Sequence, residues 1–313
     1  MKVLILTDKC GSVTNEDEAD TLLEVKAVKQ ALRTLDHTVQ VVEFSLNLPV
    51  TAARIERSGC DMVFNLVENL SSSRLLHLVP MLCETLSIPC SGGDAYTLLA
   101  TGDKLIAKRL LRTAGLPTPD WVDAGGDRKA FLGSPMILKP VAQEASIGIS
   151  DASVRSFSNS EELDDALTKH REYFAERYID GREFNLSILP GGIILPVCEM
   201  QFVDYPAGKA KIVGYEAKWK EASFAYRHTC RNYIFQDKDA SLTMELRRLA
   251  SAAYRLFGSS GYARIDFRVD KAGKPYILEM NSNPCITADS GFIAAAEQAG
   301  LSYSQVIERL LER

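Results

Sequence analysis

Two alternating runs near the end of the sequence, at residues 262–270 and 276–284, constrain the fold of the chain more than any other feature. In the first run the apolar residues that face one way are Ala263, Ile265, Phe267 and Val269. The charged residues that alternate with them are Arg264, Asp266, Arg268 and Asp270. The second run alternates too, with Tyr276, Leu278 and Met280 opposed to Ile277, Glu279 and Asn281. A period of two on both sides of a short loop predicts a β-hairpin.

The pairing register of this hairpin predicts a metal site. Symmetric closure of the loop gives these pairs: Asp270 with Pro275, Asp266 with Glu279, and Arg264 with Asn281. Directly opposed residues have Cβ atoms roughly 5 Å apart, so the two carboxylates repel each other unless a cation lies near them. Oxygen ligands from Asp, Glu and Asn suit Mg²⁺ or Mn²⁺ rather than zinc. The alternative is an exposed hairpin face with ordinary charges, which accounts for either carboxylate alone but poorly for the whole set.

Charge and apolar pattern argue against two classes of partner. The chain has 313 residues and a formal net charge of −5, which argues against a nucleic-acid footprint and against an anionic membrane surface. No apolar run approaches the roughly 20 residues that a membrane span needs, and residues 1–7 read as a first strand rather than a signal peptide. The 7 cysteines are an odd number without a C-x-x-C pair, which predicts reduced thiols in a cytoplasmic protein.

Residues 1–98 alternate between strand and helix patterns. Short apolar runs predict strands at 3–6, 38–44 and 61–67, and a strand end at 88–93. Helical spacing predicts helices at 18–35, with Leu22 on the apolar face, and at 75–86. The alternation predicts an open parallel sheet whose ligand-facing loops follow Thr7 and Val67. No G-x-G-x-x-G follows the first strand, so a dinucleotide site is not expected there.

The rest of the chain reads as antiparallel sheet with helices. A helix begins near Thr101, and a strand at 135–140 carries Lys139 at its end. The small and polar residues 143–150 follow as a mobile loop. Further strands are predicted at 173–179, 183–189 and 193–197, and a last helix at 303–311. The fold class is therefore α/β, with an α+β C-terminal part.

Three lysines narrow the chemistry that the predicted metal site serves. Lys104, Lys139 and Lys218 stand in different elements, and Lys139 adjoins the loop 143–150. Lysine is a point charge suited to phosphate oxygens, and a metal, several lysines and a closing loop are together typical of phosphoryl transfer from a nucleotide. For any single lysine, a solvated surface charge is the commoner explanation. A P-loop is excluded because the sequence has no Walker A pattern.

Six short segments occur along the chain in a specific order. They are Gly102-Asp-Lys104, Ile137-Leu-Lys-Pro140, Glu176–Glu183, Tyr215-Glu-Ala-Lys218, Arg264-Ile-Asp266 and Leu278-Glu-Met-Asn281. In this order and spacing the chain resembles the ATP-grasp superfamily, and within it the D-alanine–D-alanine ligases. The resemblance implies an ATP-grasp fold with an N-terminal open parallel-sheet domain. Its parts would be residues 1–98, a central subdomain at 99–180, and a C-terminal subdomain at 181–313 with the metal and catalytic site.

The resemblance also implies a role for each matching residue. The residues assigned to ATP are Lys104, Lys139, Ser146, Glu176, Ile179, Glu183 and Lys218. Of these, the first two lysines would hold phosphates, Glu176 and Ile179 would meet the adenine, and Glu183 the ribose. Asp266, Glu279 and Asn281 would carry two Mg²⁺ or Mn²⁺ ions. The catalytic residues would be Arg264 at an oxyanion, Lys218 near the γ-phosphate, and Ser290 at the carboxylate of the second substrate.

Several positions around the first substrate depart from the family pattern. Residues 6–12 and 65–71 do not reproduce its usual motifs, Ala145 replaces a loop serine, and Trp219 replaces a tyrosine. Cys285 stands where a glycine is usual, and we expect an inert thiol there unless its setting is electropositive. The first substrate therefore need not be D-alanine, because a pocket without its hydrogen-bonding partners discriminates poorly.

The resemblance thus predicts an ATP-dependent carboxylate–amine ligase that joins two small amino acids through an acyl phosphate and releases ADP and phosphate. One alternative is a ligase of the same superfamily for a different amino acid or a natural-product amide. Another, from a different class, is a nucleotide-binding protein without catalysis, against which the retained Arg264 argues. The expected partners are small-molecule amino acids, with no nucleic acid and no membrane, and a homodimer is possible.

Overall fold

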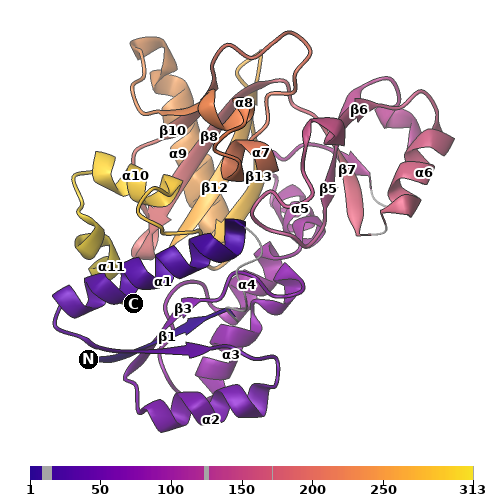
Figure 1. The fold of residues 1–313 in the computed structure, drawn as a ribbon. Helices are drawn as coiled ribbons and strands as arrows, with labels where there is room; N and C mark the ends of the chain where they lie inside the picture. Colours follow the sequence, from indigo (N-terminus) through magenta and orange to yellow (C-terminus); the bar gives the residue numbers. More distant parts are fainter. Residues whose placement is uncertain (9–15, 123–126, 171, 313) are drawn as a thin grey trace.

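The computed structural model describes residues 1–8, 16–122, 127–170 and 172–312, which form three sheets with helices around them (Figure 1). Short 3-10 helices in these ranges are Ser73–Leu75, Lys129–Phe131, Asp151–Ser153, Pro190–Gly192 and Asp237–Asp239. None of the helices in the described ranges combines the length and the apolar character that crossing a membrane requires.

The first sheet is parallel, as predicted, with β1 (Lys2–Thr7) between β2 (Thr38–Glu43) and β3 (Met62–Leu66). Its helices are α1 (Glu16–Thr34), α2 (Leu48–Ser58) and α3 (Leu78–Thr85). Val3 and Ile5 of β1 pack in one core with α1, whereas Leu4 and Leu6 pack in another with residues of α2 and α3. A strand covered on both faces needs a continuous apolar run, which is why β1 lacks polar alternation.

Three details of this region differ from the prediction. On α1 the predicted apolar face is buried at Val28, Ala31 and Leu32, but Leu22 is 39% exposed and Glu24, which is 1% exposed, is buried at that end of the helix. The predicted helix at 75–86 is interrupted, because a 3-10 turn precedes α3. The predicted strand end at 88–93 contributes only an isolated bridge to the sheet, since a proline in it has no N–H to donate.

The second sheet is antiparallel, in the order β4 (Trp121–Val122), β7 (Tyr173–Arg177), β5 (Pro135–Pro140) and β6 (Val154–Ser156). The helix α6 (Ser160–Lys169) packs against it. Two helices precede the sheet, α4 (Ala95–Thr101) and α5 (Lys104–Thr113). Thr101 therefore ends a helix instead of beginning one. Asp103 caps α5 by accepting the N–H groups of Leu105 and Ile106, and this fixes Lys104 in the first turn.

The third sheet runs in the order β11 (Thr229–Asn232), β10 (Cys198–Phe202), β8 (Gly181–Leu189), β12 (Ala263–Asp270) and β13 (Pro275–Ser282). The short β9 (Ile193–Ile194) pairs with β8. Three helices accompany it: α7 (Tyr215–Trp219), α8 (Phe224–Arg227) and α9 (Ala240–Leu256). The apolar residues that were predicted to share a face of β12 are all buried in one core with α9. The opposite face of β12 is thereby left for the charged residues.

The strands β12 and β13 form the predicted hairpin, with Asp266 opposite Glu279 and with Arg264 and Asn281 paired one step further. The predicted pairing of Asp270 with Pro275 is wrong, because Val269 occupies that position opposite the proline. A β-bulge lies just beyond Asp266 and shifts the register by one residue toward the turn. The alternation near the site predicted the register correctly, and the assumption of symmetric loop closure did not.

The extra residue of the bulge is Leu278, which has no partner across the hairpin. It breaks the predicted alternation of β13, since Ile277 joins Met280 in the core while Leu278 lines a cavity. The N–H of Ile277 donates instead to the carbonyl of Pro117, at 2.8 Å. The bulge therefore aims Glu279 and its neighbours at the cavity without exposing the core.

Two helices follow β13 and return to the first sheet, α10 (Gly291–Gln298) and α11 (Tyr303–Leu311), the second with the predicted bounds. In Figure 1, α11 lies beside α1, and the two ends of the chain are near each other. Val306 and Leu310 share one core with Val3, Ile5 and Val28. The core on one face of the first sheet is thus completed by the last residues of the chain.

Candidate active site

A cavity of about 610 Å³ lies between strands of the second and third sheets and collects most of the predicted site residues. Those that line it are Lys139, Ser146, Glu176, Ile179, Glu183, Lys218, Arg264, Asp266, Glu279, Asn281 and Ser290. Lys104 lies beside it, with its Nζ 3.3 Å from a carboxylate oxygen of Glu279. Segments that are far apart in the sequence are therefore adjacent in space. The role of each residue stays a prediction.

Asp266 lies in the middle of the third sheet, where three side chains donate hydrogen bonds to its carboxylate. Arg264 donates two, each at 2.7 Å, Asn281 donates one at 3.0 Å, and Asn185 of β8 donates one at 2.7 Å. Asn185 was not predicted, although it shares a face with Glu183 along a predicted strand and lies directly opposite Asp266. Carboxylate and amide oxygens collected in this way fit the ligand preference of Mg²⁺.

Cations offset the repulsion between Asp266 and Glu279. Burial alone would raise the pKa of Glu279, but the Lys104 ammonium, followed by the Lys139 ammonium and the Arg264 guanidinium, lowers it to about 2. The side chain is therefore a carboxylate at any physiological pH. The like-charge pair that predicted a metal site is present, and lysine and arginine side chains balance it.

Glu176 of β7 holds two lysines at the other wall of the cavity. Lys139 lies 2.7 Å from one of its oxygens and Lys108 of α5 lies 2.5 Å from the other. Lys108 is 1% exposed and also donates to the hydroxyl of Thr118 at 2.7 Å. Burial would raise the pKa of Glu176, but these two lysines lower it. Lys108 was not predicted as a site residue, and its buried charge has a structural partner in Glu176.

Glu183 and Arg268 form a second buried pair beside the cavity, 3.4 Å apart. Burial raises the pKa of Glu183 to about 7, and Arg268 only partly opposes this. Glu183 can therefore change its protonation state near neutral pH. A carboxylate in this position can accept hydrogen bonds from hydroxyl groups, which suits the predicted contact with a ribose.

The loop 143–150 is tied to the segment that carries Lys218. The indole Nε1 of Trp219 donates to the carbonyl of Ala145 at 2.9 Å, and the hydroxyl of Ser146 donates to the carbonyl of Val213 at 2.8 Å. Tryptophan can only donate through its ring nitrogen, so the contact differs from any that a tyrosine hydroxyl could make as an acceptor. These bonds hold the loop over the cavity next to Lys218.

Ser290 begins α10 and also lines the cavity. Its hydroxyl accepts a hydrogen bond from the N–H of Ile293 at 3.2 Å, which is the usual helix-capping contact. The first turn of α10 thus presents N–H groups and a hydroxyl together, an arrangement that favours anions. A carboxylate of the second substrate is a suitable ligand for it.

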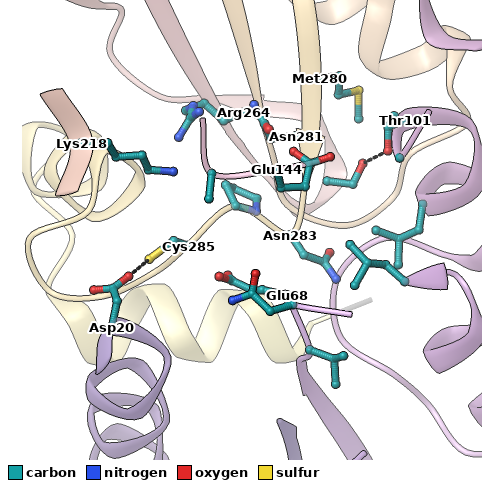
Figure 2. A pocket seen from close by; sticks show the side chains of 18 of the residues that line it. Asp20, Glu68, Thr101, Glu144, Lys218, Arg264, Met280, Asn281, Asn283 and Cys285 are labelled. Carbon is teal, nitrogen blue, oxygen red and sulfur yellow. Dashed lines mark hydrogen bonds between the residues drawn. The ribbon is translucent and has the colours of Figure 1, made fainter. Parts of the chain in front are cut away.

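A second, smaller cavity of about 70 Å³ adjoins the first and shares Arg264, Asn281 and Lys218 with it. Figure 2 shows its acidic lining, with Asp20 and Glu68 on one side and Glu144 near Asn281 on the other. The sequence did not predict these carboxylates as site residues. The available signal was Glu24, an acidic residue at the helical spacing of the apolar face of α1, which lies behind Glu68.

Cys285 lies in an acidic setting, so the exception that would have favoured a reactive thiol does not apply among the described residues. Its Sγ donates to a carboxylate oxygen of Asp20 at 3.3 Å (Figure 2). Burial, followed by the charges of Glu24 and Glu68, raises the pKa of the thiol well above its ordinary value. The thiolate is therefore disfavoured, and the setting supports the expected inert thiol.

Comparisons with known proteins agree with this arrangement. The family described as D-ala D-ala ligase C-terminus matches residues 110–312. The D-alanine–D-alanine ligase of Synechococcus sp. (strain JA-2-3B'a(2-13)) is 32% identical over 299 residues, which cover 92% of this chain and 86% of that protein. The D-alanine–D-alanine ligase of Gloeobacter violaceus is 30% identical over 326 residues, which cover 100% of this chain and 99% of that protein. The solved structure of the D-alanine–D-alanine ligase of Bacillus anthracis complexed with ATP aligns with a TM-score of 0.76 at 23% identity. The alignment covers 100% of this chain and 97% of that one. The predicted ATP-grasp fold is confirmed.

Proposed function

Because the chain belongs to the D-alanine–D-alanine ligase family, we propose that it is an ATP-dependent ligase that joins the carboxylate of one small amino acid to the amine of another. Two of its relatives bear the name D-alanine–D-alanine ligase, so D-alanine is the first substrate to test. The observation that supports this chemistry most is one cavity lined by a cross-strand carboxylate pair, Arg264 and two lysines, with Lys104 beside it.

The proposed reaction has two steps. The γ-phosphoryl group of ATP passes to the donor carboxylate, which gives ADP and an acyl phosphate. The acceptor amine then attacks the acyl carbon; the C–N bond forms, the bond to phosphate breaks, and the amine loses a proton. Negative charge develops first on the phosphoryl oxygens and then on the acyl oxygen, so fixed cations beside these oxygens lower both barriers.

The cations of this chain are already held near anionic side chains that a substrate can replace. Lys139 would exchange part of its contact with Glu176 for a phosphate, and Lys104 would do the same from Glu279. Lys218 would approach the γ-phosphate from α7. Arg264 would turn from Asp266 to the acyl oxyanion, for which its planar guanidinium offers two parallel donors.

Asp266, Glu279 and Asn281 would hold two Mg²⁺ or Mn²⁺ ions, which supply charge neutralisation at the phosphates when bound. The fit rests on the oxygen donors of these side chains and on Asn185, which fixes the orientation of the Asp266 carboxylate from the neighbouring strand. Metal binding there would compete with Arg264 for Asp266, and so would release the arginine toward an anion.

The test is ADP and phosphate release by the purified chain with ATP, MgCl₂ and D-alanine. We expect release that depends on both the amino acid and the divalent metal, with a dipeptide detectable by mass spectrometry. ATP binding without ADP release for any amino acid would favour the non-catalytic nucleotide-binding alternative. Release with another amino acid or amine but not with D-alanine would favour the ligase of different specificity.

Three further parts of the proposal concern organisation. The division into residues 1–98, 99–180 and 181–313 is supported by the three sheets, whose strands fall within those ranges. A cytoplasmic location fits the thiol state of Cys60, Cys198, Cys230 and Cys285. A homodimer is testable by light scattering after size-exclusion chromatography.

A further inference from the structure

The smaller cavity has a cluster of acceptor atoms at its base. One oxygen each of Glu24 and Glu68 and the Sγ of Cys285 all lie within 4.8 Å of one another. We call these three side chains the acidic cup. They come from α1, from the loop after β3 and from the segment after β13, so the cup forms only when the first and third sheets are assembled. Glu68 and Cys285 line the cavity, and Glu24 lies behind them.

The carboxylate of Glu24 is incompletely satisfied. Its Oε1 accepts the N–H of Ile286 at 2.6 Å, but its Oε2 has no hydrogen-bond partner among the described residues. Glu24 is 1% exposed, so water contributes little to its solvation. An unpaired carboxylate oxygen at this depth costs free energy, and retaining one points to a ligand that brings donors into the cup.

A primary ammonium group matches the geometry of the cup. It offers three N–H donors in a tetrahedral arrangement. With hydrogen bonds of about 2.8 Å and tetrahedral angles, the three acceptors of an ammonium lie roughly 4.6 Å apart. That separation falls within the limit for Glu24, Glu68 and Cys285. A zinc ion would bring its ligand atoms to roughly 3.5 Å from one another and would need the thiolate form of Cys285, which the neighbouring carboxylates disfavour.

More carboxyl groups surround the cup than a single ammonium would contact. Asp8 lies directly behind Glu68 and accepts the backbone N–H groups of Glu68 and Asn69, and Asp20 contacts Cys285. The positive charge of Lys218 acts on both Asp20 and Glu68. A further carboxylate, Glu144, lines the same cavity on the side of Asn281 and Arg264 (Figure 2).

We propose that the donor substrate is a diamino acid, with its α-carboxylate beside Arg264, its α-ammonium beside Glu144 and its side-chain ammonium in the acidic cup. The inference rests on the proposed ligase function and specifies its first substrate. Two positive charges then meet the two acidic ends of one cavity. An alanine side chain would leave acceptor oxygens of Glu24 and Glu68 without a donor, and these buried unpaired polar groups are what disfavours the smaller donor.

The first experiment compares donors with D-alanine fixed as acceptor. Each enantiomer of ornithine and of 2,4-diaminobutyrate is compared with norvaline, which has the carbon chain of ornithine without the terminal amine. We expect kcat/KM for the better diamino acid to exceed that for norvaline by roughly 100-fold, as expected for one buried charged contact. Fragmentation of the product in a mass spectrometer identifies which residue was the donor. Norvaline or D-alanine performing as well as the diamino acids would overturn the proposal while leaving the ligase function intact.

The second experiment uses variants of the cup. Glu68→Gln and Glu24→Gln should each raise the KM of the diamino donor at least about tenfold and leave the KM of ATP unchanged. Glu84→Gln, on the exposed face of α3, is the matched control and should change neither. Equal effects on the donor and on ATP, or no effect on either, would refute the assignment.

A binding measurement separates this proposal from the ligase function itself. Ornithine without ATP should raise the melting temperature of the wild-type chain, and Glu68→Gln should abolish that rise. If no amino acid releases ADP, the ligase proposal fails, and the ornithine shift still reports on the cup. Stabilisation by equimolar zinc chloride alone, with none by ornithine, would identify a metal site and overturn the ammonium assignment.

Discussion

Replacing Glu24 with glutamine is expected to stabilise the ligand-free protein in a pH-dependent way. Burial, opposed in part by the N–H of Ile286, raises the pKa of Glu24 from 4.5 to about 8. The folded chain therefore retains this proton over a range in which the unfolded chain has released it. Because the folded state then binds more protons than the unfolded state, the contribution of Glu24 to the free energy of unfolding falls as pH rises from about 4.5 to about 8. Above about pH 8 this contribution is constant.

The size of the effect follows from the same pKa. At about 1.4 kcal/mol per pH unit, moving from 4.5 to about 8 corresponds to an upper bound of roughly 5 kcal/mol. Glutamine keeps an acceptor for the N–H of Ile286 but loses the charge assistance of that bond, which costs about 1 kcal/mol. We therefore expect a net gain of about 2–4 kcal/mol at pH values near 9 and little difference near pH 4. The titratable groups that face Glu24 are Asp8, Asp20, Glu68, Tyr262, Cys285 and Tyr303.

The assay is urea unfolding of the wild type, Glu24→Gln and the exposed control Glu84→Gln at several pH values between about 4 and 9. The gain for Glu24→Gln should grow across this range, and the control should follow the wild type. A gain that is the same at every pH would mean that the substitution acts through packing rather than through charge. A loss of stability near pH 9 would show that Glu24 has a strong cationic partner in the folded chain, which would refute the reasoning.

The remaining predictions concern the larger cavity. Glu279→Gln should reduce turnover by roughly 100-fold or more and shift the metal dependence. It should also lower the free energy of unfolding by about 1 kcal/mol, because Lys104 loses an ionic partner. Full activity of this variant without metal would contradict the prediction. Lys139→Met should weaken ATP binding about tenfold by calorimetry and cost about 1–3 kcal/mol in urea, since Glu176 retains Lys108 but loses one of two buried partners. Ser290→Ala should raise the KM of the acceptor but not of ATP, and loss of the helix cap should lower the free energy of unfolding by ~1 kcal/mol. Ser302→Ala removes a comparable cap on α11 and should lower the free energy of unfolding by a similar ~1 kcal/mol without any change in KM.

The part of the site that could be predicted from the sequence is local. Strand alternation constrains which side chains share a face, and this was sufficient to pair Asp266 with Glu279. The same pattern cannot reveal a bulge, because Leu278 is as apolar as Ile277. The N–H of Ile277 leaves the ladder for the carbonyl of Pro117, which a distant loop supplies. The register was therefore correct near the charged residues and wrong at the turn.

The acidic cup could not be predicted from patterns of this kind. Its members are Glu24, Glu68 and Cys285, and no periodicity relates positions in a helix, a loop and a post-strand segment so far apart. The usable signal was the buried position of Glu24 on α1. When a helix carries a carboxylate at the spacing of its apolar residues, either another residue of the protein or a bound ligand pairs with that carboxylate. A single sequence does not distinguish these two cases.

The contact of α11 with α1 and β1 has a consequence for synthesis of the chain. Val306 and Leu310 cover the side of the first sheet that carries Val3 and Ile5, and they are translated about 300 residues after it. The emerging polypeptide must therefore carry an uncovered apolar surface through most of its time on the ribosome, where chaperones can bind it. A message truncated by a stop codon after α10 should yield a product that aggregates or is degraded, even though every residue of the larger cavity has been made. Synthesis of α11 is therefore the step that covers this face of the first sheet.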